Sequence, residues 1–411
     1  MQIGKHFFIA AVFTGMVAGG IFGAITGQEY VLISTLAALF LKSLKMMVIP
    51  IVAASIITGI SSLGDIRKLK KIGLLTITYY ISTTLLAVTI GLILVNFIEP
   101  GTMAATETDG EIFKKSYSIF SVILAMVPEN IFKAMADGDV LPVIIFSIIF
   151  GAALTTIGEK GEAILDIFNG IFHVSIKIIE VIILFAPIGV FALVAERIGR
   201  AGGWDAFSAE LGSLGLYIVT VLAGLFLHAF VILPIILVVL GRIKPFLFVK
   251  QMVEALTMAF STASSSATLP VTLKCLNNTP EIKKSVSSFV LPLGATVNMD
   301  GTALYEAVAA IFIAQAYGIE LSFSQQAIVA ITATLAAIGA AGIPEAGLVT
   351  MIIVLESVGL PAEGIGLILA VDWFLDRCRT TVNVWGDGVG AAVLSNFTNH
   401  TKLGAGSKFD H

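Results

Sequence analysis

Long apolar runs separated by short polar connections fill the first part of the chain. Runs of the length that a membrane-crossing helix needs, about 20 residues, lie at 5–27, 31–62, 72–98, 117–156, 162–198 and 209–241. The first run is followed by no clear small-residue cleavage site, so it is interpreted as a retained helix and not as a signal peptide. The pattern predicts a multi-pass helical membrane protein.

The pattern changes in the second half, where two apolar runs are broken near their middle. STASSSATLP (261–270) breaks the run at 251–272, and IGAAGIPEAG (338–347) breaks the run at 324–357. The flanks are too short to span a bilayer comfortably, and irregular backbone at membrane depth occurs only where protein or a wet cavity meets it. Each run therefore predicts a hairpin that enters the membrane and turns back.

A full-length segment with its own polar interruption follows each hairpin. The first contains NMDGT (298–302) and the second DWFLDRCRTTVNVWGD (372–387). Hairpin and helix thus occur twice in the same order, a pattern typical of transporters built from repeats with discontinuous helices and a site near the bilayer midplane.

Charged residues in the connections predict the orientation. Arg67, Lys68, Lys70 and Lys71 make the loop after the second run basic, and Arg242, Lys244 and Lys250 follow the sixth. The loop at 99–113 is acidic. Because short basic loops stay in the cytoplasm, the N-terminus is expected there too.

Composition supports the membrane interpretation and excludes other classes. The chain has 411 residues, of which 57% are hydrophobic and only 13% charged, whereas soluble domains are about 25% charged. The net charge of −4 gives no basic footprint for nucleic acid. Neither cysteine fits a metal or redox motif, and no organic cofactor is expected. The histidines are too scattered to predict a His-based metal site; they are His6, His173, His228, His400 and His411.

The stretch 372–387 concentrates charge on one face when read as a helix. Asp372, Asp376, Arg379, Asn383 and Asp387 recur at intervals of three or four residues, whereas Arg377 points elsewhere. A central Asp or Arg costs about 2.5–3.5 kcal/mol in a membrane helix, so this face must meet ions, ligand or partner charges. Arginine suits a carboxylate, and carboxylate and amide oxygens suit a hard cation. The alternative is a structural ion-pair helix.

Other polar groups are weaker candidates. An unwound NMDGT segment would free carbonyl oxygens for a cation beside Asp300, although a kinked helix explains the motif equally well. Glu306 is isolated in an apolar helix, where burial favours its neutral form and suits it to carry a proton; a structural pair with an arginine is the alternative. Ser264–Ser266 could hold a carboxylate at a hairpin tip, or form an ordinary loop. Thr83 and Thr84 could simply bond within their own helix.

Four motifs in this order carry a resemblance to a known family: SSSATLP, NMDGTALYEA, GAAGIPEAGLVT and DWFLDRCRTTVNVWGD. They resemble the glutamate transporter family, the dicarboxylate/amino acid:cation symporters, and the resemblance covers the whole chain, most densely 250–395. It implies an all-α fold of eight transmembrane helices plus two re-entrant hairpins with inverted repeats, assembled as a homotrimer that works by an elevator motion. The scaffold would comprise 1–70 and 117–208. The transport domain would comprise 71–116, including an extracellular loop, and 209–411.

The resemblance also implies roles for the substrate-binding residues. Arg379 is similar to the residue that clamps the substrate side-chain carboxylate, and Asp376 to the one that binds its amino group. The further substrate contacts that it implies are Thr302, Thr380, Asn383, Ser264, Ser265 and Gly342.

Three sodium sites are implied in the same way. Asp387 resembles the centre of one site, with oxygens from Gly294, Asn298 and Asn383. Asp300 resembles the centre of a second, with Thr83, Thr84 and the Asn298 side chain. A third uses backbone carbonyls near Thr296 and Ala337–Ala340, under the second hairpin, which acts as a gate. The remaining residues expected at these sites are Tyr80, Met299 and Ile338.

Three positions indicate the subtype. Arg379 favours acidic amino acids, and Arg377 with Ala263 resembles the animal excitatory transporters. Glu306 occupies the place of their proton-carrying glutamate, which implies proton cotransport and, less directly, potassium countertransport. The short termini and the absence of a long insertion in the fourth segment favour the plasma membrane (the inner membrane) of a prokaryote.

Rival functions remain at this point. A C4-dicarboxylate symporter and a proton-driven glutamate carrier are the nearest. An intramembrane protease would need a second motif to accompany WGDG (385–388), and none matches, so no enzyme activity is expected. Channel activity would be a side activity, because paired gates favour alternating access.

Overall fold

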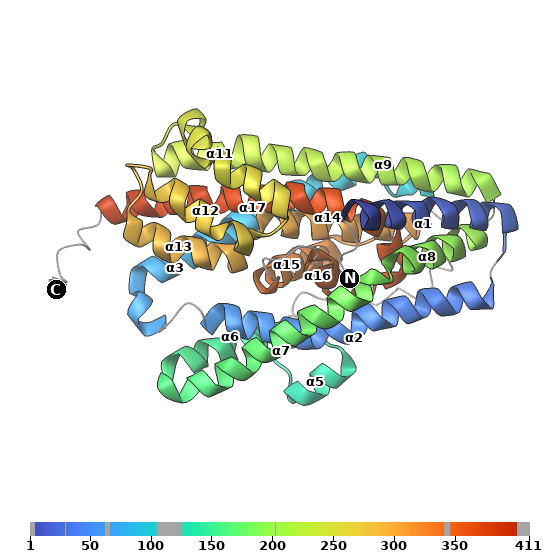
Figure 1. The fold of residues 1–411 in the computed structure, drawn as a ribbon, viewed down its shortest axis with the longest axis horizontal. Helices are drawn as coiled ribbons and strands as arrows, with labels where there is room; N and C mark the ends of the chain where they lie inside the picture. Colours follow the sequence, from blue (N-terminus) through green and yellow to red (C-terminus); the bar gives the residue numbers. More distant parts are fainter. Residues whose placement is uncertain are drawn as a thin grey trace.

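The structure is a computed structural model that describes residues 5–28, 30–61, 66–104, 124, 126–201, 203–340 and 346–400. Throughout these residues the regular elements are helices, and none is a strand (Figure 1). Five helical segments, some made of more than one element, are long and apolar enough to cross a membrane: Val31–Ser61, Ile72–Ile98, Glu159–Leu184, Phe207–Gly241 and Lys284–Ala316. An all-helical membrane protein with several spans is therefore confirmed.

The first three helices follow the predicted runs, except that the third begins at Ile66 and so includes the basic residues 67–71 that were expected in a loop. They are α1 (Lys5–Thr26), α2 (Val31–Ser61) and α3 (Ile66–Ile98), followed by the short 3-10 helix η1 (Thr102–Ala104). The next two runs, by contrast, are not single helices, and that expectation was wrong. The described part of 117–156 forms α5 (Ile131–Asp137) and α6 (Val140–Thr156), because Gly138 ends α5 with a positive φ of 79°.

The run at 162–198 is divided into α7 (Glu159–Leu184) and α8 (Ala186–Ala201). Phe185 separates the two helices, and Pro187 is the second residue of α8. Proline has no backbone N–H and clashes with the preceding turn, so it is tolerated at the start of a new helix and not within an old one.

The sixth run contains two π-helical segments. It begins as α9 (Gly203–Leu227) and continues as η2 (His228–Ile232), α10 (Leu233–Ile236) and η3 (Leu237–Gly241). A carbonyl in each π segment accepts a side-chain hydrogen bond from the last helix: Trp385 Nε1 donates to Ala229 O at 3.0 Å, and Asn396 Nδ2 donates to Leu240 O at 2.8 Å. The two π segments therefore join this run to the last helix.

Both broken runs form pairs of short helices that pack against each other. The first pair is α11 (Pro245–Thr262) and α12 (Ser265–Asn277); the second is α15 (Phe323–Gly339) and α16 (Ala346–Ser357). In the first pair Ala263 adopts the left-handed conformation, and the Ser264 hydroxyl caps α12 by accepting from the Ala267 N–H. The helices have 12–18 residues, fewer than the roughly 20 of a typical membrane-crossing helix.

The full-length segments after the two helix pairs differ from each other. The first is interrupted as predicted, into α13 (Lys284–Val297) and α14 (Asp300–Ala316). The second follows the short η4 (Ala362–Gly364) and is one continuous helix, α17 (Ile365–His400), which confirms that the polar stretch 372–387 is helical, although it is not broken as the first segment is. Asn383 and Asp387 are instead accommodated inside a regular helix by contacts with the interrupted one.

The interrupted segment lies at the centre of the molecule. In Figure 1, α2, α6 and α7 lie along one side and α9 along the other, with α14 and α17 between them. Nearly every residue of α14 is buried. The hydrophobic core has two clusters: α14 contributes to the first and α13 to the second, so the break between them lies where the two meet.

Candidate functional site

The break between α13 and α14 brings a carboxylate of α17 against α13. Asn298 and Met299 leave the helical conformation, and the buried Asn298 side chain donates from Nδ2 to Asp387 Oδ1 at 2.9 Å. Asp387 is itself almost fully buried. The polar atoms of the NMDGT motif thus face the second polar motif across the break.

Gly294 makes this close approach possible. A Cβ atom at this position would lie 2.3 Å from Asp387 Oδ1 and 2.6 Å from the Tyr80 hydroxyl oxygen, closer than any van der Waals contact allows. The Tyr80 hydroxyl donates to the Val290 carbonyl oxygen at 2.9 Å. Asp387, Asn298, Gly294 and Tyr80, all predicted for the sodium sites, therefore lie together.

A second buried carboxylate, Asp300, lies at the first turn of α14, where the helix N-terminus favours negative charge. The hydroxyl groups of Thr84 and Thr83, on α3, donate to its Oδ1 at 2.7 and 3.3 Å. Its Oδ2 lies 2.9 Å from Nε2 of His228. The predicted trio of Asp300, Thr83 and Thr84 is therefore contiguous, with a histidine added.

Sequence reasoning missed His228, because the five histidines were judged only as ligands of one shared metal site. The signal that could have found it is its setting: a single ionisable side chain in the apolar stretch LAGLFLHAFVILP. Ionisable residues within membrane spans are rare and usually functional. His228 is fully buried and begins the π segment η2.

Arg379 of α17 is fully buried between two carboxylates of its own helix. Its Nη2 lies 2.8 Å from Asp376 Oδ1 and 3.1 Å from Asp372 Oδ1. The guanidinium carbon lies 3.8 Å from the ring centroid of Tyr305, a cation–π distance. One positive and two negative groups leave this cluster with a formal surplus of one negative charge. Asp372, which the sequence left without a role, is a partner of the arginine.

The second helix pair approaches the same cluster. A Cβ atom at Gly347, in α16, would lie 2.7 Å from Arg379 Nη1, so only glycine allows the helix this close. Nearby, the Thr350 hydroxyl of α16 donates to the carboxylate of Glu306 in α14, and Glu306 is fully buried. The arginine cluster, the isolated glutamate and the expected gate are therefore neighbours.

Asn383 connects α17 to the start of α14. Its Oδ1 accepts from the Gly301 N–H at 2.8 Å, one of the free N–H groups of a helix N-terminus, and its Nδ2 donates to Thr302 Oγ1 at 3.2 Å. Arg377 points away from this face: it donates to the Trp373 carbonyl oxygen, and its guanidinium carbon lies 5.3 Å from the centroid of the Trp373 ring.

The remaining predicted residues are less closely joined to the cluster. The Ser264 hydroxyl caps α12, as described above, and Ser265 and Thr380 are buried. Thr296 donates to the Leu293 carbonyl oxygen within α13. Ala337, Ile338 and Ala340 lie at the C-terminal end of α15, where carbonyl oxygens carry partial negative charge. Gly342 lies outside the described residues.

The donor set fits a hard monovalent cation. Around Asp300 and Asp387 the available oxygens come from carboxylates, hydroxyls, an amide and backbone, and such oxygens suit alkali and alkaline-earth ions. Across the described residues, no group of three or more His, Cys, Asp and Glu side chains could hold a metal ion, so a cation site here would need hydroxyl, amide and backbone oxygens as well. The arrangement has one buried carboxylate at each of the two places, enough to balance a single positive charge.

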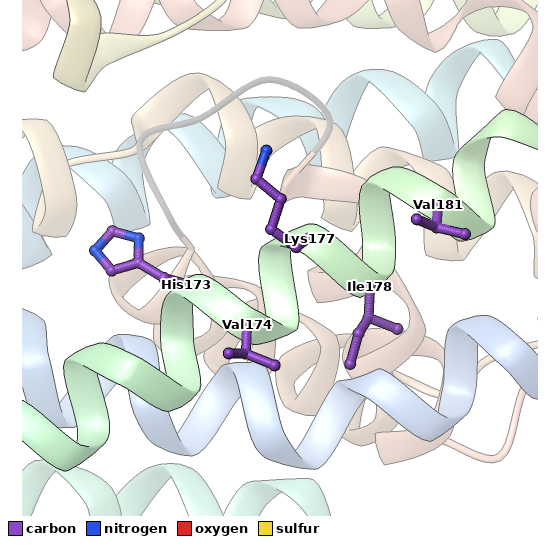
Figure 2. Close-up of a pocket in the computed structure, with 5 residues that line it drawn as sticks. All are labelled: His173, Val174, Lys177, Ile178 and Val181. Carbon is purple, nitrogen blue, oxygen red and sulfur yellow. The ribbon is translucent and has the colours of Figure 1, made fainter. Parts of the chain in front are cut away.

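A groove on another part of the surface lacks the converging carboxylate, hydroxyl and amide groups of this site. It lies along α7 and is lined by His173, Val174, Lys177, Ile178 and Val181 (Figure 2). Its surface is almost entirely apolar, and Val174 and Ile178 extend from the same side of the helix. No convergent set of polar groups could orient a small solute there, so we exclude the groove as the substrate site.

Comparisons with known proteins agree with the motifs. The profile of the sodium:dicarboxylate symporter family matches residues 8–397. Excitatory amino acid transporter 3 of Mus musculus is 39% identical over 413 residues, 88% of this chain and 78% of the relative. An excitatory amino acid transporter of Caenorhabditis elegans is 36% identical over 461 residues, 98% of this chain and 91% of the relative.

The match extends over both halves of the chain and includes every motif around the buried carboxylates. The identity is also well above what a shared fold alone requires. The chain therefore belongs to the sodium:dicarboxylate symporter family, a family of transporters and not of enzymes.

Proposed function

We propose that this protein is a secondary active, sodium-coupled symporter of the acidic amino acids L-glutamate and L-aspartate. The observation that carries the proposal is the fully buried Arg379 between Asp372 and Asp376. A buried guanidinium beside a surplus carboxylate matches a substrate that has a side-chain carboxylate and an ammonium group.

Substrate binding would exchange partners within this cluster. The side-chain carboxylate of the substrate would replace Asp376, which contacts Arg379 through Nη2 alone, and could pair with the guanidinium through two parallel hydrogen bonds. Asp376 then accepts hydrogen bonds from the substrate ammonium group, while Asp372 stays on the arginine. Thr302, Thr380, Asn383, Ser264, Ser265 and Gly342 complete the set of substrate contacts. Each buried charged group would keep a partner, and the two surplus negative charges of the loaded cluster, one from the protein and one from the substrate, would be offset by the cotransported cations.

Sodium ions would be cotransported at three sites. Asp387 with Gly294, Asn298, Asn383 and Tyr80 forms one, and Asp300 with Thr83, Thr84, Asn298 and Met299 forms another. The third uses carbonyl oxygens near Thr296, Ala337, Ile338 and Ala340. In support of this, Asn298 and Asn383 link the Asp387 site to the start of α14, which carries Thr302. Cation binding at the break is therefore coupled to the geometry of the substrate contacts.

Glu306 would carry the cotransported proton. Its carboxylate is fully buried, its hydrogen-bond donor Thr350 belongs to the gate helix α16, and protonation would remove an uncompensated charge from the site. Potassium countertransport would return the empty carrier, as the resemblance to excitatory amino acid transporters suggests.

The transport cycle would be an elevator motion within a homotrimer in the plasma membrane, with the N-terminus in the cytoplasm. The transport domain (71–116 and 209–411), with its re-entrant hairpins and inverted repeats, would move against a scaffold (1–70 and 117–208). The apolar side chains of α7 support an exposed scaffold face that meets lipid or a partner subunit: Ile167, Ile171, Val174, Ile178 and Val181 are exposed.

The decisive experiment is uptake into proteoliposomes with sodium, proton and potassium gradients imposed separately. We expect an inward sodium gradient to drive uptake of labelled L-aspartate or L-glutamate. A proton-driven carrier would work without sodium. In a C4-dicarboxylate symporter, succinate would compete strongly with labelled aspartate. Succinate has no ammonium group, so it would leave the surplus carboxylate beside Arg379 without a partner. Failure to take up either amino acid under any gradient would contradict the proposal.

A further inference from the structure

Both oxygens of the Asp300 carboxylate are hydrogen-bonded, but their partners differ in what they can do next. The Thr83 and Thr84 hydroxyls donate to Oδ1, and His228 Nε2 lies 2.9 Å from Oδ2. A hydroxyl can rotate and present its lone pairs to a cation. Thr83 has alternative acceptors, since the carbonyl oxygens of Tyr79 and Tyr80 lie 3.2 and 3.1 Å from its Oγ1.

The imidazole cannot change its role in this way. When a cation lies on Asp300 the carboxylate is ionised, so Nε2 must carry the hydrogen and donate it. The N–H direction is fixed by the ring, and the ring is fully buried. Nδ1 has no hydrogen-bond partner among the described residues, so within them the bond to Asp300 is the one polar contact of this side chain.

We propose that His228 is the positioning residue of the Asp300 cation site: its Nε2–H holds Oδ2 and leaves Oδ1, between two threonine hydroxyls, to face the cation. The inference rests on the proposed sodium coupling and adds a residue that the motif comparison did not assign.

A carboxylate at this position needs such an anchor. The terminal torsion of aspartate has broad minima, so the group turns easily about its Cβ–Cγ bond. Asp300 also lies in the first turn of α14, where the free backbone N–H groups attract negative charge. Without the histidine, the carboxylate could rotate toward its own helix end and withdraw Oδ1 from the threonines.

The test uses three substitutions that separate the donor from the ring. His228→Gln places an amide N–H near the position of Nε2, His228→Asn carries the same amide on a shorter side chain, and His228→Leu removes the donor. The full-length purified protein is heated at increasing sodium concentration without amino acid, and the sodium concentration that gives half of the maximal stabilisation is measured. The same sodium series is repeated for uptake by proteoliposomes.

The Asn and Leu variants are expected to raise the half-saturating sodium concentration about 10- to 100-fold, the usual effect of losing an outer-shell partner of a metal ligand. The Gln variant should stay close to the unchanged protein. Thr220→Val is the matched control, because Thr220 is a fully buried polar residue of the same run that bonds only the Leu216 carbonyl in its own helix among the described contacts. It should leave the sodium dependence unaltered.

Two results would overturn the assignment. One is a general loss of thermal stability in the Asn and Leu variants with an unchanged half-saturating sodium concentration, which indicates a structural histidine. The other is a Gln variant as weak for sodium as the Asn variant, which indicates that the ring and not its donor matters. If the unchanged protein itself failed to respond to sodium, the proposed function would fail first, and this inference with it.

Discussion

The helices α17 and α7 both carry charged residues within a membrane-length segment, but they use them differently. In α17 the charged side chains of the polar face are buried, and Arg379 forms ion pairs with Asp372 and Asp376, whereas Arg377 lies off this face. In α7, Lys177 and Glu180 pair one turn apart, 2.6 Å from each other, and their side chains are 76% and 57% exposed. Charge in a membrane span indicates a transport site only when the fold encloses it and gives it partners.

A third charged pair shows that burial alone is not enough. Arg197 of α8 and Glu210 of α9 form a buried ion pair, and Arg197 also donates to the Ala316 carbonyl oxygen at 2.8 Å and lies over the Tyr317 ring. These contacts join the ends of three helices. One guanidinium faces one carboxylate in this pair, so their charges are equal and opposite. We therefore interpret it as structural, unlike the α17 cluster.

The largest effect should come from removing the arginine of α17. Arg379→Met leaves Asp372 and Asp376 buried without a cation, and breaking a buried pair in this way costs about 3–5 kcal/mol. We expect uptake of acidic amino acids to be abolished and the melting temperature to fall. Arg379→Lys keeps the positive charge but loses the planar guanidinium that binds a carboxylate through two hydrogen bonds. We expect this variant to lose aspartate uptake while its melting temperature stays above that of Arg379→Met. That result would separate substrate recognition from folding. Normal aspartate uptake by both variants would contradict a role for the buried arginine of α17 in substrate binding.

The second largest effect concerns the close packing of α13 and α17. In Gly294→Ala the new methyl group would overlap Asp387 Oδ1, and such overpacking costs about 1–3 kcal/mol. We expect sodium to bind more weakly, which would be measured as a higher half-saturating sodium concentration for uptake. Gly170→Ala in α7 is the matched control, since no atom lies within 4 Å of a Cβ built there. An equal response of the two variants would contradict a sodium site at Asp387.

The third prediction separates the buried glutamate of α14 from the exposed one of α7. With proton cotransport, an outside-acid gradient should accelerate uptake by the unchanged protein, because each inward cycle consumes a proton from outside. Glu306→Gln should remove this response to the pH gradient while sodium still drives uptake. Glu180→Gln should keep the response. Uptake that ignores the pH gradient in the unchanged protein would rule out a proton role for Glu306.

The smallest effect is expected at Lys177. Lys177→Met removes one partner of an exposed pair, and such pairs contribute about 0–1 kcal/mol. Uptake and melting temperature should therefore stay close to those of the unchanged protein, in contrast to Arg379→Met. A loss of uptake comparable to that of the arginine variant would mean that the exposed pair has a partner in the assembled transporter.

The sequence predicted those parts of the fold that local residues determine. The two helix pairs and the break at Asn298 follow from small and polar residues that interrupt apolar runs. The break after Phe185 was missed, because apolar residues continue through Pro187 and hide a change of helix. The helical reading of 372–387 was confirmed, since a polar stretch remains helical when a neighbour satisfies its side chains, as the Gly301 N–H does for Asn383.

The candidate site was predictable to a similar degree. Helical spacing placed Asp376, Arg379 and Asp387 on one face, and the motifs placed Asp300 with the threonines of α3. The pairing of Asp372 with Arg379 could also have been predicted, because Asp372 lies on the same helix face one turn before Asp376. The contact of His228 with Asp300 could not be derived, because it joins positions 72 residues apart through the register that the π segment sets.

The hydrogen bonds from α17 to the two π segments limit insertions and deletions in both helical runs. Trp385 and Asn396 are eleven residues apart, and so are their acceptors, Ala229 and Leu240. An insertion or deletion of one residue between the acceptors would rotate one of them about 100° away from its donor. Only a matching change between residues 385 and 396 would restore both bonds. Relatives should therefore vary in length at the loops around these two helices, while this paired interval keeps its length in both.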